Sequence, residues 1–163
     1  MSNIRIVTGV LYEMDKGNIA IGGVETYVRS LNDSLKKDGH SVTIYQLSDE
    51  KFEIMMDGMH LVGTGIKRTR KVRKDIAKMM KIVHACSDCE NDILIFITDG
   101  LIVKNDFNHS VAIQHGIDWD VTVSQPVSDL MNTISIIKSI SKNLKVHFRM
   151  TRCKNIVCVD YFC

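Results

Sequence analysis

The sequence predicts an α/β fold in which helices cover both faces of a parallel sheet. Three observations lead to this prediction. Short apolar segments alternate along the chain with segments of helical periodicity. The strand-like segments are continuous apolar runs, which is typical of strands buried on both faces. The first strand, helix and second strand also follow one another as a βαβ unit, and such a unit pairs its strands in parallel.

The N-terminal third contains this βαβ unit. Residues 4–8 are a short apolar run with β-branched side chains and predict the first strand, and a loop follows over residues 9–21. Gly39 ends the helix that comes next, and residues 42–45 begin the second strand. The helix itself is predicted from apolar residues that recur on one face. These are Val24, Tyr27, Val28, Leu31 and Leu35.

The middle of the chain predicts a hairpin and a second helix. Residues 54–56 and 59–62 are short apolar runs on either side of Asp57-Gly58, a dipeptide that favours a two-residue turn. Residues 67–86 have helical periodicity. The apolar face of this helix consists of Val72, Ile76, Met79, Met80 and Val83.

The remaining elements continue the alternation. Residues 92–97 form the clearest buried parallel strand of the sequence, and residues 110–114 form another. Pro126 is suited to the first turn of a long helix, which we expect to run to about Met150. Residues 155–159 predict a last strand.

Length and composition indicate one globular domain over residues 1–163. The hydrophobic content of 45% and the charged content of 25% are ordinary for such a domain, and the net charge is only +2. The N-terminus has no feature of a secretory leader, and no window approaches the roughly 18 apolar residues of a membrane span. Five cysteines without a framework of paired spacings favour a reducing, cytoplasmic location.

The spacing of Cys86 and Cys89 is that of half a zinc site. A structural zinc ion needs four ligands, and the sequence has no second Cys-x-x-Cys or histidine pair to complete the set. A thioredoxin-type pair would stand at the start of a helix, whereas this pair follows the end of one. We therefore expect free thiols, and no metal or cofactor.

Two glycines, Gly22 and Gly23, precede the first predicted helix. Glycines in this position leave backbone N–H groups accessible to a phosphate, with the helix dipole behind them. They also serve ordinary turns. The G-x-G-x-x-G spacing of a dinucleotide fingerprint is absent, and no G-K-[ST] follows as in a Walker loop.

In a parallel sheet, ligands bind beyond the carboxyl ends of the strands. Asp99 follows the strand at residues 92–97, and His115-Gly116 follows the strand at residues 110–114. We expect both to lie at the same sheet edge as the Gly22-Gly23 loop. His115 is either a satisfied structural residue or a hydrogen-bonding partner for a sugar hydroxyl or a phosphate.

Two acidic residues, Asp118 and Asp120, flank Trp119 just beyond this histidine. They either contact ligand hydroxyls or are simply solvated.

The helix predicted over residues 67–86 has a basic face. Five lysines fall within roughly 80° of one another on a helical wheel. They are Lys67, Lys71, Lys74, Lys78 and Lys81. Such a stripe is either a solvated face or a surface that attracts anionic lipid headgroups. The aromatic content of 6% gives little support to nucleic-acid binding, and we expect none.

Several segments together resemble the opening of the family 4 glycosyltransferases of the GT-B fold. A G-G-x-E sequence, here residues 22–25, begins the first helix of that family, and a G-H-x-V turn, here residues 39–42, leads to the second strand. Residues 111–116 are similar to the family's strand that ends in His-Gly. Residues 155–160 resemble the strand that closes its N-terminal lobe. The resemblance covers nearly the whole chain.

The resemblance implies a retaining transferase that moves a sugar from a nucleotide-sugar donor to a glycan or lipid-linked acceptor. Such enzymes have two Rossmann-like lobes, of which the N-terminal one binds mostly acceptor, and usually need no metal. The Gly22-Gly23 loop with Glu25 would approach the donor diphosphate. His115 would take the catalytic position by hydrogen-bonding the donor sugar, and Gly116 and Asp118 would lie in the same substrate site. Membrane attachment through basic surfaces would suit the lysine stripe.

The second lobe of the family, with its paired glutamates and basic phosphate clamp, has no counterpart in these 163 residues. We therefore expect a truncated acceptor-side domain that is inactive alone, in the cytoplasm or peripheral on the inner face of the plasma membrane. Two alternatives remain open. One is a self-contained Rossmann-like protein that binds a nucleotide or phosphate, and the other is a basic membrane-surface interaction module.

Overall fold

The computed structural model describes residues 1–115, 144, 145 and 147–159. Its centre is a seven-stranded sheet with the order β5-β6-β4-β1-β7-β8-β9, in which only the β5–β6 pair is antiparallel. The strands are β1 (Asn3–Val7), β4 (Ser41–Gln46), β5 (Lys51–Met56), β6 (Met59–Thr64), β7 (Ile93–Phe96), β8 (His109–His115) and β9 (Asn155–Val159).

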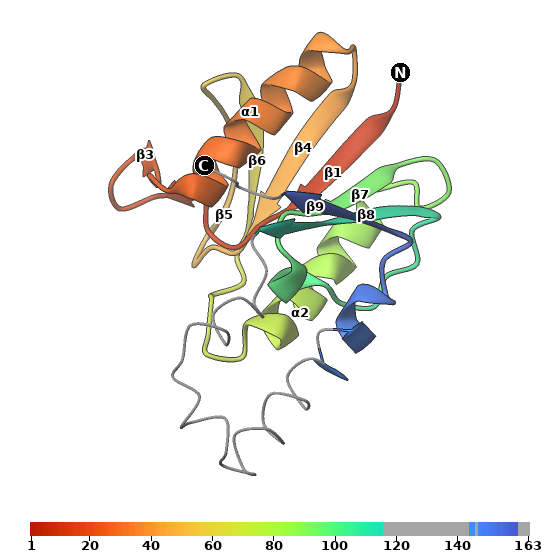
Figure 1. Ribbon diagram of the computed structural model, residues 1–163. Helices are drawn as coiled ribbons and strands as arrows, with labels where there is room; N and C mark the ends of the chain where they lie inside the picture. Colours follow the sequence, from red (N-terminus) through yellow and green to blue (C-terminus); the bar gives the residue numbers. More distant parts are fainter. Residues whose placement is uncertain (116–143, 146, 160–163) are drawn as a thin grey trace, which may run out of the picture.

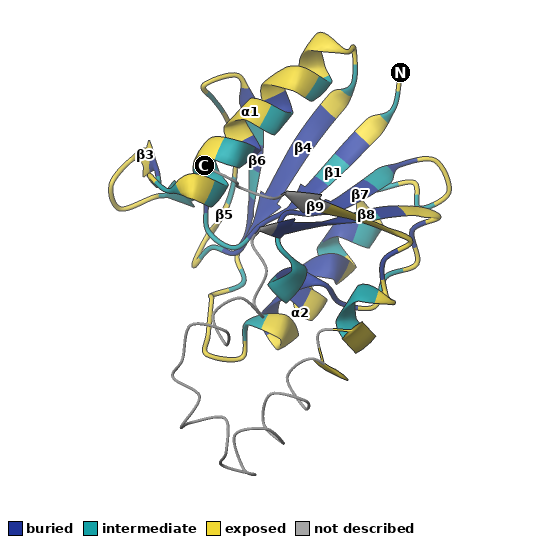
Figure 2. Cartoon of the chain, in the orientation of Figure 1, coloured by how far each residue is buried: buried dark blue, intermediate teal, exposed yellow. Residues whose placement is uncertain are grey.

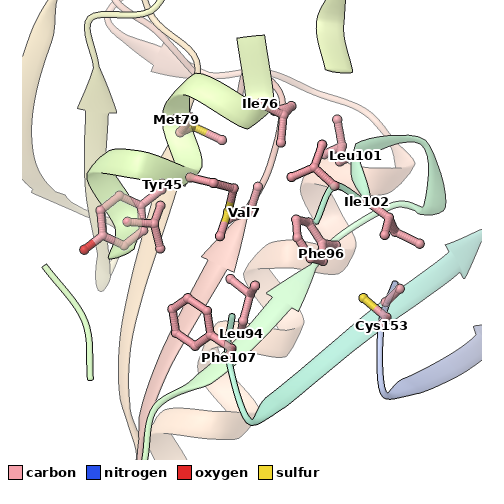
Figure 3. Packing of buried hydrophobic residues seen from close by; sticks show 14 of the residues in the cluster. Val7, Tyr45, Ile76, Met79, Leu94, Phe96, Leu101, Ile102, Phe107 and Cys153 are labelled. Atoms are coloured by element: carbon pink, nitrogen blue, oxygen red, sulfur yellow. The ribbon is translucent and has the colours of Figure 1, made fainter. Parts of the chain in front are cut away.

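Two helices cover opposite faces of the sheet, α1 (Gly23–Lys37) and α2 (Val72–Ala85) (Figure 1). Successive strand residues alternate between the two sides, because neighbouring side chains of a strand point to opposite faces. Ile6 packs in the cluster on the α1 side, whereas Val7 packs in the cluster on the α2 side (Figure 3). The predicted α/β fold with a mostly parallel, doubly covered sheet is confirmed.

Burial is deepest in the central strands and decreases toward β9 (Figure 2). Ile6, Ile44 and Leu94 are fully buried, whereas Ile156 and Val157 of β9 are 40% and 47% exposed. The continuous apolar run at residues 155–159 had predicted a strand buried like the others. Among the described strands β9 pairs only with β8, at the edge of the sheet, and this position explains the difference.

The loop predicted over residues 9–21 contains a small antiparallel ribbon of β2 (Tyr12–Glu13) and β3 (Asn18–Ile19). Strands of two residues are too short to give a periodicity, so the sequence did not predict them. The buried Gln46 side chain holds the ribbon against β4. Its Oε1 accepts hydrogen bonds from the Leu11 and Tyr12 amides at 3.1 and 2.7 Å, and its Nε2 donates to the Tyr12 carbonyl at 2.8 Å.

The predicted hairpin is confirmed as β5–β6. Its turn has Asp57 at φ 48° and Gly58 at φ 73°, the left-handed conformations that a two-residue hairpin turn of type I′ requires.

The prediction that a helix begins at residue 67 is wrong, because α2 begins at Val72. Lysine and arginine have good helix propensity, so the basic segment before Val72 fits a helical pattern. In the structure, Thr69 instead donates two hydrogen bonds to Asp75 Oδ2, from its amide at 2.8 Å and its hydroxyl at 2.7 Å. These hydrogen bonds hold residues 69–71 outside the helix and lower the pKa of Asp75.

The C-terminal part agrees with the prediction where it is described. Residues 144, 145 and 147–150 are helical, as expected of a helix ending near Met150, and β9 covers the predicted last strand. The predicted helix start at Pro126 lies outside the described residues. No helix in the described part of the chain is both long and apolar enough to cross a membrane.

Candidate functional site

The carboxyl edge of the sheet carries the Gly22-Gly23 loop, Asp99 and the end of β8. Strands β1, β4, β6, β7 and β8 are parallel, so their carboxyl ends meet at one edge. Both helices begin at this edge, α1 at Gly23 and α2 at Val72, and a 3-10 turn over Asp99–Leu101 follows β7 there (Figure 1). The predicted convergence of the Gly22-Gly23 loop, Asp99 and the end of β8 is therefore confirmed for the backbone.

Neither Gly22 nor Gly23 is required by the local backbone conformation. Gly22, the N-cap of α1, is extended at φ −174° and ψ 174°, which any residue adopts, and Gly23 is helical. The glycines with positive φ in the described residues are Gly17, Gly39, Gly58 and Gly65. A Cβ added at Gly23 would have no atom within 4 Å. An ordinary turn therefore does not explain why residue 23 is glycine.

The side chain of Glu25 lies over the N-terminus of α1. A Cβ added at Gly22 would overlap the Glu25 carboxylate, so that carboxylate folds back onto the N-cap. No side chain caps the helix, and the Thr26 hydroxyl donates to the Gly22 carbonyl at 2.9 Å. The carboxylate thus occupies the position where the helix dipole favours an anion.

Gly9 belongs to the same edge and was not singled out from the sequence. It lies two residues beyond the end of β1, has no positive φ, and a Cβ there would also meet open space. Its carbonyl accepts a hydrogen bond from the Leu47 amide at 2.8 Å, which joins the ends of β1 and β4. The signal that could have found it is a glycine immediately after the first strand of a βαβ unit.

An open groove of about 710 Å³ lies between the β2–β3 ribbon and the end of β4. Its apolar wall includes Tyr12 and Leu47. Among the described residues, Arg68 is its one basic lining residue, and its acidic lining residues are Glu13, Asp15, Asp49 and Glu50. Carboxylates accept hydrogen bonds from hydroxyl and amino groups and repel anions. Glu13 and Asp49 are already paired with Lys16 and Lys67, so Asp15 and Glu50 are the lining carboxylates for which the described residues show no ion pair. The groove therefore suits a polyhydroxyl ligand that donates hydrogen bonds.

The backbone of His115 lies at the end of β8, opposite Val159 of β9. Its side chain, Gly116 and Asp118 lie outside what the structure describes. The carboxylate of Asp99 already has an ionic partner, because its Oδ2 lies 3.3 Å from Nη2 of Arg149.

The lysine stripe is only partly a helix face. Lys74, Lys78 and Lys81 are exposed on α2, but Lys71 is the N-cap residue and Lys67 precedes the helix. Lys67 Nζ also pairs with Asp49 Oδ2 at 2.7 Å. The prediction of a five-lysine stripe on one helix is wrong in its first two members, because α2 begins later than its periodicity indicated. A membrane-surface role of these lysines stays a prediction.

The described cysteines are free thiols of different exposure. Cys86 is exposed, Cys89 is half-buried and Cys153 is buried. Burial raises the pKa of the Cys153 thiol to about 11, so it is neutral at physiological pH. Within the described residues, no group of three or more histidine, cysteine or acidic side chains is placed to hold a metal ion.

Comparison of the chain with known protein families, with curated proteins and with solved structures finds no match.

Proposed function

We propose that this chain is the N-terminal, acceptor-side domain of a retaining GT-B glycosyltransferase that uses a nucleotide-sugar donor. The observation that carries the proposal is the Gly22-Gly23 pair at the start of α1. Glycine at residue 23 is required neither by its backbone conformation nor by its packing. A ligand that approaches the backbone closely supplies the missing reason, and the N-terminus of a 15-residue helix favours an anionic group there.

The donor diphosphate would be that anionic group. It would replace the Glu25 carboxylate over the helix N-terminus, and the first N–H groups of α1 would stabilise the charge that develops on the leaving diphosphate. His115, at the end of β8, would hydrogen-bond the donor sugar. Gly116 and Asp118 would complete the sugar site.

The acceptor would bind in the groove between the β2–β3 ribbon and the end of β4. The carboxylates of Asp15 and Glu50 offer hydrogen-bond acceptors for the hydroxyl groups of a glycan, while Tyr12 offers an apolar ring against a sugar face. Glu13 and Asp49 are already paired with Lys16 and Lys67, at 2.7 Å each. The glycan that accepts the sugar and the diphosphate of the donor would thus bind at separate places, the groove and the N-terminus of α1. The proposed function requires both places on this domain.

Sugar transfer requires the donor and the acceptor to be bound together in a reactive orientation. In the proposal, this domain contacts the donor from one side only. We expect the 163-residue chain alone to transfer no sugar when it is mixed with radiolabelled nucleotide sugars and a panel of glycan and lipid-linked acceptors. Turnover by the chain alone that survives repurification would contradict an acceptor-side domain. It would favour a self-contained enzyme.

A further inference from the structure

The buried side chain of Gln46 spends its whole hydrogen-bonding capacity on the main chain around it. Gln46 is 1% exposed. Its Oε1 accepts from the Leu11 and Tyr12 amides, and its Nε2 donates to the Tyr12 carbonyl and, at 3.4 Å, to the Leu47 carbonyl. A glutamine amide has two acceptor and two donor positions, so none remains for a ligand. Although Gln46 lines the groove, it can act on a ligand only through the residues that it holds.

Tyr12 is the lining residue that Gln46 holds most firmly, because both its amide and its carbonyl bond to the same side chain. The Tyr12 ring also packs edge-to-face on Phe52 of β5, with ring centroids 5.5 Å apart and an interplanar angle of 69°. The Phe52 ring in turn lies over Gly63 of β6, where an added Cβ would overlap it. Tyr12 is thus fixed at its backbone by Gln46 and at its ring by Phe52.

The groove combines this fixed ring with acceptors for hydroxyl groups. Tyr12 is half-buried, and Asp15 and Glu50 line the same groove. A pyranose has C–H groups on its faces and hydroxyl groups around its edge, so it suits an apolar ring with carboxylates nearby. We propose that Gln46 is a positioning residue of the acceptor site, which holds Tyr12 in place for a pyranose ring of the acceptor to stack on it. The inference rests on the proposed function, which makes the groove the acceptor site.

The first test is titration of the ¹⁵N-labelled 163-residue chain with the methyl glycosides of glucose, galactose and mannose, each in both anomeric forms. At least one glycoside should shift the Tyr12 amide saturably, with a Kd of about 10 mM or tighter. Tyr12→Ala and Gln46→Met should each weaken this binding about fivefold or more. Methionine resembles glutamine in length but makes none of the four hydrogen bonds. Absence of saturation with all of the glycosides, or an unchanged Kd in Gln46→Met, would overturn the inference.

Thr64→Val is the matched control for the loss of a buried hydrogen bond. The Thr64 hydroxyl, in a residue 3% exposed, donates to the main-chain carbonyl of Gln46 at 2.9 Å and does not touch the ribbon. We expect both Thr64→Val and Gln46→Met to lower the melting temperature, but only Gln46→Met to lower the glycoside affinity. An equal loss of affinity in the two variants would mean that Gln46 merely stabilises the end of β4, and would overturn its positioning role.

Gln46→Glu adds a pH readout that a structural role would not give. At about pH 8 the introduced carboxylate has no proton to donate to the Tyr12 carbonyl. At about pH 5 its protonated form can donate to that carbonyl and accept from an amide, and burial favours this neutral form by raising the pKa of the introduced group. The affinity of Gln46→Glu, relative to wild type at the same pH, should therefore recover at about pH 5. A relative affinity that does not change with pH would contradict the inference.

The outcomes separate this inference from the proposed function. Glycoside binding that requires Tyr12 and Gln46, without nucleotide-sugar binding at the Gly22-Gly23 loop, would support the groove site and refute the transferase. Nucleotide-sugar binding at that loop, without glycoside binding at Tyr12, would refute the inference alone.

Discussion

Asp92→Ala is expected to lower the free energy of unfolding by about 3–5 kcal/mol, because it leaves a largely buried guanidinium without its partner. The Asp92 side chain is 2% exposed and pairs with Arg5 Nε at 2.9 Å, and that of Arg5 is 16% exposed. Asp92 also accepts hydrogen bonds from Asn3 Nδ2 at 3.0 Å and from the Asp88 amide at 3.1 Å. Urea unfolding followed by circular dichroism measures the change.

The exposed pair of Lys67 and Asp49 is the matched control. Its side chains are 74% and 64% exposed, so Asp49→Ala should change the free energy of unfolding by about 1 kcal/mol or less. The double variant Arg5→Met/Asp92→Leu should recover much of the loss, since no unpaired charge remains. A loss below about 1 kcal/mol in Asp92→Ala would contradict the role of this pair in joining β1 to β7.

Gly23→Val is expected to weaken nucleotide-sugar binding by about tenfold or more while leaving the fold intact. A Cβ at Gly23 meets no atom within 4 Å, and the backbone conformation suits any residue, so the free energy of unfolding should change by about 0.5 kcal/mol or less. The added methyl groups would instead occupy the space through which a diphosphate reaches the backbone. Calorimetric titration with a nucleotide sugar measures the effect.

Ala77→Val is the control for this variant, because Ala77 is an exposed position on α2 where the same side chain is introduced. It should leave the affinity unchanged. Equal affinities of the wild type and Gly23→Val would contradict a ligand role for the glycine loop, whatever their stabilities.

The sequence predicted the sheet and both helices because their signals are local. Ile4 to Val7 and Leu94 to Phe96 are continuous apolar runs, and the apolar residues of α1 recur on one face. Other features depend on contacts that periodicity does not report. The start of α2 is set by the Thr69–Asp75 hydrogen bonds, and the ribbon after β1 is held by Gln46 from another strand.

Only part of the candidate site could be predicted from the sequence, because the rest depends on backbone angles and contacts that periodicity does not report. The place of Gly22 and Gly23 at the carboxyl edge follows from the βαβ order alone. That their conformation does not need glycine could be learned only from φ angles and from the space around them.

In the proposed function, the glycine loop at the start of α1 receives the phosphates of a nucleotide sugar. Amide chemical shifts of the ¹⁵N-labelled chain, followed during titration with UDP-, GDP- and ADP-linked hexoses, test it most directly. The amides of Gly22, Gly23 and Val24 should shift together and saturate with one of these donors, at a Kd of about 1 mM or weaker for a single domain. If these amides stay unmoved while amides elsewhere in the chain shift, the nucleotide sugar binds away from the glycine loop and the proposal is contradicted.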